Sequence, residues 1–98
     1  MFEILVIDDD KNTRRLMNAI LLGAGYTPVL AEDGEKALEI CNTHHVDMVI
    51  VDIMMPNLDG YEFTRILRKN NQDIPIIMVS AKELPDDRKK GFKAGIDD

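Results

Sequence analysis

The chain is poor in cysteine, in basic residues and in long apolar runs. Its single cysteine, Cys41, cannot form an internal disulfide, so we expect a reducing, cytoplasmic compartment. No apolar run approaches the roughly 20 residues that cross a bilayer, which argues against a membrane protein. The 12 Lys and Arg residues face 18 Asp and Glu residues, and the net charge of -6 argues against a basic nucleic-acid surface. Because Met1 leads directly into an apolar run, we expect no signal peptide.

The remaining composition is that of one small globular domain. The 98 residues are 45% apolar and 31% charged, which is typical of a folded chain and not of a disordered one. A chain of this length holds one domain at most, so we assign residues 1–98 to a single domain. Cys41 is then expected to act as a small apolar residue on the inner face of a helix.

Strand-like and helix-like segments alternate along the chain. The strand-like runs are 2–7, 27–31, 48–51 and 74–79, and the helix-like segments are 11–24, 34–43, one that follows Asp59 and one that begins near Pro85. This alternation predicts an α/β fold with a parallel sheet. Pro28 lacks a backbone N–H, so the second run fits best at an edge of that sheet.

Three aspartates follow two of the strand-like runs. Asp8 and Asp9 come directly after residues 2–7, and Asp52 comes after residues 48–51. In an open parallel sheet, binding sites lie outside the carboxyl ends of the strands. If the two strands are neighbours, the three carboxylates meet there, and their mutual repulsion favours a bound cation. We therefore expect a divalent metal site, with one carboxylate free to act as a nucleophile.

Several short motifs occur in a fixed order along the chain. In that order they are Asp8-Asp9, Asp52, Pro56, Gly60, Ser80-Ala81-Lys82, Gly91-Phe92 and Ala94-Gly95-Ile96-Asp97-Asp98. Pro56 and Gly60 fall four and eight residues after Asp52. With these motifs, the whole chain resembles the receiver domain of bacterial two-component response regulators. Gly91-Phe92 and the residues up to Asp98 resemble the end of that domain's fourth helix.

The resemblance implies a flavodoxin-like, doubly wound parallel sheet with strand order 2-1-3-4, in which the strands before Asp8 and Asp52 are neighbours. The family also has a fifth strand that ends in lysine, and a fifth helix, and this chain shows no counterpart of either. We therefore expect a receiver domain that is incomplete at its C-terminal end. The apolar run 76–79 would then lie on an open sheet edge, which predicts self-association through the fourth strand or marginal stability.

The resemblance also implies a set of site residues. Asp52 would accept the phosphoryl group, and Ser80 would contact that group and shift towards it as a switch. Mg²⁺ would be bound by Asp9, Asp52 and the backbone carbonyl of Met54, and Asp8 would act directly or through a water. The phosphoryl group would come from a sensor histidine kinase, and the signal would pass to an output domain or protein.

The implied role is that of a phosphoacceptor with self-catalysed transfer and dephosphorylation, and not that of an enzyme. Residues 51–56 also look like the branch of the family whose output is transcriptional. Any contact with nucleic acid would then be made by an output domain and not by this chain.

Two other functions compete with this one. A haloacid-dehalogenase-like phosphatase also uses a strand-end aspartate and Mg²⁺, but it needs a second aspartate where Met54 stands. A receiver fragment without a signalling role is the other alternative. Asp10 and Asp59 are expected to cap helices. A metal role for His44 and His45 is an alternative, but we expect a solvated helix end, on the ground that no acidic partner is nearby in sequence.

Overall fold

One mixed sheet forms the centre of the protein. The computed structural model describes residues 1–55, 58–70, 73–79 and, by their backbone only, 92–93. The elements are β1 (Glu3–Ile7), α1 (Lys11–Gly23), β2 (Thr27–Ala31), α2 (Gly34–Thr43), β3 (Met48–Asp52), α3 (Gly60–Lys69), β4 (Ile76–Val79) and β5 (Phe92–Lys93). The strand order is β2-β1-β3-β4-β5.

The first four strands are parallel, and their order confirms the predicted arrangement 2-1-3-4. Strand β1 lies between β2 and β3, and its last residue, Ile7, pairs with Ala31 on one side and with Val51 on the other. Strand β2, which contains Pro28, lies at the edge as expected. The register therefore places the residues that follow β1 beside the residues that end β3.

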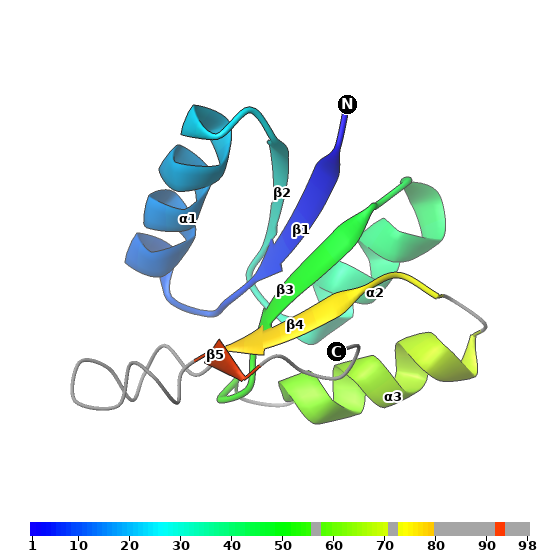
Figure 1. The fold of residues 1–98 in the computed structure, drawn as a ribbon. Helices are drawn as coiled ribbons and strands as arrows, with labels where there is room; N and C mark the ends of the chain where they lie inside the picture. The colour runs from blue at the N-terminus through cyan, green and yellow to red at the C-terminus, as the bar shows by residue number, and fades with distance from the viewer. Residues whose placement is uncertain (56–57, 71–72, 80–91, 94–98) are drawn as a thin grey trace.

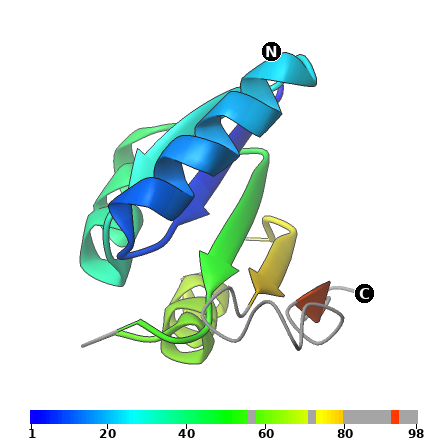
Figure 2. The ribbon, with the colours of Figure 1, turned by 90° about the vertical axis from the view of Figure 1, so that its left-hand side faces the viewer.

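The helices cover the two faces of the sheet unequally. Helix α1 lies on one face, and α2 and α3 lie on the other (Figures 1 and 2). The larger core lies on the face of α2 and α3, where Leu5 and Val49 of the sheet pack with Cys41 and Phe63 of the helices. A smaller cluster joins Ile4, Val6 and Leu21 on the face of α1. None of the helices in the described ranges could cross a membrane.

An aspartate caps the N-terminus of each described helix. The side chains of Asp10, Asp33 and Asp59 accept hydrogen bonds from backbone N–H groups in the first turns of α1, α2 and α3, at 2.9, 2.8 and 2.9 Å. These bonds satisfy donors that have no partner within the helix. Helix α1 ends before Gly25, whose φ of 92° places it in the left-handed region that glycine tolerates. The predicted caps at Asp10 and Asp59 are thus confirmed.

The single cysteine is a core residue. Cys41 is a free thiol buried in the larger core, as expected for a small apolar residue on the inner face of α2. Burial raises the pKa of the Cys41 thiol, because the charged thiolate loses its solvation. A raised pKa keeps the thiol protonated and unreactive.

Apolar residues recur at spacings of three and four along α1, which predicts one buried stripe, but this stripe is less buried than the spacing suggests. Leu21 is buried, but the side chains of Leu16 and Ile20 remain 60% and 53% exposed. The reason is geometric: within the described residues α1 is the only helix on its face, so it meets the sheet along one side and has no second helix beside it. The helical spacing shows which side chains share one face of α1, but it does not show how many of them have a packing partner.

The far edge of β4 differs from expectation. Instead of an open edge, the two-residue strand β5 pairs antiparallel with β4, Phe92 with Val79 and Lys93 with Met78. The expected helix end at Phe92 is therefore wrong, and the rest of the helix expected from Pro85 lies outside the described residues. An edge strand presents free N–H and C=O groups, and pairing satisfies them. Self-association through β4 stays a prediction, which sedimentation measurements can test.

The two histidines after α2 are exposed at the helix end, as predicted, but each has an acidic partner. His44 Nε2 lies 2.6 Å from Glu3 Oε1, and His45 Nε2 lies 2.7 Å from Asp47 Oδ1. The other carboxylate oxygen of Asp47 accepts a 2.8 Å hydrogen bond from the backbone N–H of Glu3. The contacts of Glu3 with His44 and Asp47 join the turn before β3 to the start of β1, at the end of the sheet opposite the three aspartates. These two contacts arise because β1 and β3 are neighbours, whereas His45 and Asp47 are only two residues apart in the sequence.

The contacts of Asp47 predict a specific loss of stability in acid. The backbone hydrogen bond from Glu3, and then the His45 contact, lower the pKa of Asp47 below its ordinary value of 3.8. A lowered pKa stabilises the fold at neutral pH, and this contribution disappears as the pH falls through the folded-state pKa. Urea melts from pH 5 to pH 2 should therefore show a shallower acid loss in Asp47→Asn than in wild type. The exposed Asp73→Asn is the matched control, and an equal slope in wild type and Asp47→Asn would contradict the prediction.

The uneven burial of α1 predicts unequal effects of truncating its leucines. Leu21→Ala should lower the free energy of unfolding by about 2–5 kcal/mol, because it leaves a cavity in the smaller core. Leu16→Ala should change it by only about 0.5 kcal/mol, as expected for an exposed position. Urea unfolding of both variants checks this. Equal losses would mean that Leu16 has a partner beyond the described residues.

Candidate metal site at the carboxyl end of the sheet

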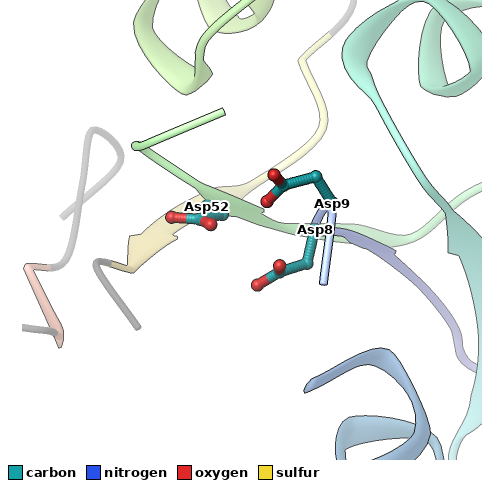
Figure 3. Close-up of side chains that lie close together, drawn as sticks. All are labelled: Asp8, Asp9 and Asp52. Atoms are coloured by element: carbon teal, nitrogen blue, oxygen red, sulfur yellow. The ribbon is translucent and has the colours of Figure 1, made fainter. Parts of the chain in front are cut away.

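Three carboxylates converge where β1 and β3 end. Asp8 and Asp9 follow β1, and Asp52 is the last residue of β3. One carboxylate oxygen from each residue lies within 4.8 Å of the others (Figure 3). The pairing of Ile7 with Val51 produces this convergence, because it sets the two strand ends side by side. The adjacency that the sequence analysis required is therefore present.

The three aspartates differ in their exposure. Asp8 is 3% exposed and Asp52 is fully buried, whereas Asp9 is exposed to solvent. Buried carboxylates lose solvation, and close neighbours of like charge disfavour joint ionisation. A cation among the three would offset both effects. Asp9 leaves the cluster open to solvent on one side, so an ion can reach it from solution.

Local hydrogen bonds fix the two buried carboxylates. Asp8 Oδ1 accepts the backbone N–H of Asp10 at 2.8 Å, and Asp52 Oδ1 accepts the backbone N–H of Met54 at 3.0 Å. Each bond spans two residues, so the turn after each strand orients the carboxylate that precedes it. The backbone of Met54 is thereby tied to Asp52, as a role for its carbonyl in the same site would require. The side chain of Met54 is largely exposed.

Arg14 is a residue of this region that the sequence analysis missed. Its guanidinium donates a 2.7 Å hydrogen bond from Nη1 to the backbone carbonyl of Asp8. The Arg14 side chain thus reaches from the first turn of α1 to the end of β1, and it brings a positive charge close to the acidic cluster. A signal existed in the sequence, since Arg14 lies on the first turn of the helix that follows the acid pair.

The donor set fits Mg²⁺. Carboxylate oxygens are hard ligands, and Mg²⁺ binds through one or two of them while it keeps several waters. Asp9 and Asp52, with the Met54 carbonyl, could supply direct ligands, and Asp8 could assist. Among the residues that the structure describes, the cluster contains carboxylates and no histidine or cysteine, so its chemistry points to a hard cation.

The remaining predicted site residues fall into two groups. Ser80, Pro56 and Lys82 lie outside the described residues. Asp10 and Asp59 are helix caps and do not join the cluster. The cluster of three aspartates is thus the part of the predicted site that the structure brings together.

Comparisons with known proteins agree with this geometry. The model of the response regulator receiver domain matches residues 4–98. A probable transcriptional regulator, ycf27, of Cyanidium caldarium is 43% identical over 95 residues, which are 97% of this chain and 38% of that protein. The chain therefore spans well under half the length of this relative.

Two solved structures are similar in fold and sequence. The receiver domain of the Francisella response regulator 1452 is 37% identical with a TM-score of 0.82, over 100% of this chain and 81% of that one. The response regulator TrrA of Thermotoga maritima, solved in complex with Mg(2+)-BeF, is 41% identical with a TM-score of 0.79, over 83% of this chain and 70% of that one. Together with the match over residues 4–98, these likenesses show that the chain belongs to the response regulator receiver family.

Proposed function

We propose that the chain is a phosphorylation-dependent signalling switch in which Asp52 accepts a phosphoryl group in the presence of Mg²⁺. The convergence of Asp8, Asp9 and Asp52 carries this proposal. Asp52 is the central candidate because it ends a strand, is buried and has one oxygen fixed by the Met54 N–H. A fixed carboxylate can attack without first losing much conformational freedom.

The reaction is a transfer between two proteins. A carboxylate oxygen of Asp52 attacks the phosphorus of a phosphohistidine on a sensor histidine kinase. The bond from phosphorus to the imidazole nitrogen breaks, its electron pair returns to that nitrogen, and an acyl phosphate forms on Asp52. Attack of water on the phosphorus later releases inorganic phosphate and restores the carboxylate. The chain is in this view a phosphoacceptor that assists its own reactions, and not an enzyme with a separate substrate.

Mg²⁺ would be held by Asp9, Asp52 and the Met54 carbonyl, with Asp8 assisting. When bound, the ion neutralises charge that builds up on the phosphoryl oxygens during transfer. The Mg(2+)-BeF complex of the similar Thermotoga protein supports this choice of metal. Ser80 would contact the phosphoryl group and act as the switch residue.

The downstream partner is an output domain or protein, and transcription is the output that we favour. The support is the similarity to a protein described as a probable transcriptional regulator, of which this chain matches 38%. The net charge of -6 makes direct nucleic-acid contact by this chain unfavourable. The free thiol of Cys41 is compatible with a cytoplasmic location. Met54 occupies the position where the phosphatase alternative needs an acid, and no contact in the described residues favours that alternative.

Phosphorylation of Asp52 is tested directly with acetyl phosphate and Mg²⁺. Mass spectrometry should show one added phosphoryl group on wild type and none on Asp52→Asn, because the amide is a poor nucleophile. Asp73→Asn, at an exposed position away from the cluster, should be labelled like wild type. Equal labelling of Asp52→Asn would move the acceptor to another residue. Absence of labelling in wild type would favour a receiver without a signalling role.

Metal binding should raise the melting temperature of the wild-type protein, because a ligand of the folded state shifts the folding equilibrium. Mg²⁺ at one hundred times its dissociation constant stabilises the fold by about 2.7 kcal/mol. Asp9→Ala should lose most of this response, since it removes a ligand at an exposed position. Without metal, Asp9→Ala should be at least as stable as wild type, because the substitution relieves repulsion within the cluster. An Asp9→Ala variant that responds to Mg²⁺ like wild type would place the metal elsewhere.

A further inference from the structure

Leu58, which lies between β3 and α3, packs closely against the start of α2. Gly34, the first residue of α2, is buried, and Leu58 lies directly against its Cα. A Cβ atom at position 34 would lie 2.7 Å from Leu58 Cδ2, 3.0 Å from Cγ and 3.1 Å from Cβ. The first contact could be relieved by rotating the leucine side chain. The contact with Leu58 Cβ could not, because that atom moves only with the backbone.

The same loop is held at its other end by a second glycine. A Cβ atom on Gly60 would lie 3.0 Å from the carbonyl oxygen of Asp52 and 3.2 Å from Ile53 Cα. The N–H of Gly60 donates to the Ile53 carbonyl at 3.4 Å, and the Thr64 hydroxyl donates to the Gly60 carbonyl at 2.8 Å. The loop therefore leaves Asp52 and returns to it at the start of α3.

Apolar side chains between Asp52 and Gly60 pack into or against the larger core. Met55 is buried in the larger core, and Leu58 packs against the same core. Met54, whose N–H orients the Asp52 carboxylate, lies between Asp52 and the Met55 anchor. Leu58 also lies two residues before Gly60, whose N–H bonds to the carbonyl of Ile53, so the packing of Leu58 against Gly34 bears on the backbone that leads to Met54.

We propose that Gly34 and Leu58 are positioning residues for the metal and phosphoacceptor site. Because glycine has no side chain, Leu58 can pack against α2 at position 34. This packing holds the Met54 backbone in place relative to Asp52. This inference rests on the proposed function of Asp52 and Mg²⁺, and it assigns to α2 a part in a site whose carboxylates come from β1 and β3. Neither residue belongs to the cluster of Asp8, Asp9 and Asp52.

The test compares Gly34→Ala with Gly23→Ala. Position 23 ends α1, and a Cβ atom there would meet nothing within 4 Å, so Gly23→Ala controls for the added methyl group. Gly34→Ala should weaken Mg²⁺ binding roughly tenfold, the lower range for loss of outer support around a metal ligand. In the metal-free protein, the NMR signals of the Met54 amide and the Leu58 methyl groups should shift in Gly34→Ala and stay in place in Gly23→Ala.

A second variant separates positioning from general destabilisation. Leu58→Gly alone should also weaken Mg²⁺ binding, and it decides the question if Gly34→Ala fails to fold. Adding Leu58→Gly to Gly34→Ala removes Cβ together with Cγ and Cδ2, so the alanine at position 34 gains space. The double variant should bind Mg²⁺ more tightly than Gly34→Ala, which two independent residues would not show.

Two results would overturn different claims. Wild-type protein that takes up neither Mg²⁺ nor a phosphoryl group would overturn the proposed function. Wild-type binding that Gly34→Ala retains in full, with an unchanged Met54 signal, would overturn the positioning role alone. Additive losses in the double variant would overturn it as well.

Discussion

The pairing of β1 with β3 is the constraint on which the rest of the molecule depends. It sets Ile7 beside Val51, and so it brings the acid pair that follows one strand to the acid that ends the other. The same pairing joins the opposite end of the sheet, where Asp47 accepts the N–H of Glu3 and donates its own N–H to the Glu3 carbonyl at 2.9 Å. Two segments that lie more than 40 residues apart are thereby held at both ends, and the polar ends of the strands flank an apolar middle.

Local signals in the sequence were sufficient for much of this arrangement. Apolar runs that end in acid located β1 and β3, and aspartates before helical stripes located the caps at Asp10 and Asp59. The strand order came from family resemblance, since periodicity alone does not say which strands are neighbours. Given that order, the cluster of Asp8, Asp9 and Asp52 followed from the common direction of parallel strands.

Several of the features that were missed depend on contacts between segments distant in sequence. The exposure of Leu16 and Ile20 depends on what packs beside α1, and the pair of His44 with Glu3 depends on a strand neighbour. The contact of Leu58 with Gly34 joins a loop to a glycine that precedes Leu58 by more than 20 residues. None of these contacts joins residues that lie within one helical turn of each other, so the local sequence pattern does not predict them.

Asp52 also belongs to the sheet itself, and this has a mechanical consequence. It pairs with Val79 in β4, and the N–H of Ile53 donates to the Val79 carbonyl at 2.8 Å. If Asp52 is the acceptor that we propose, this ladder holds its backbone in place when negative charge is added. Any movement in response would then fall to parts of the chain that are not paired within the sheet. The sheet would thus provide a stationary seat for the proposed modification.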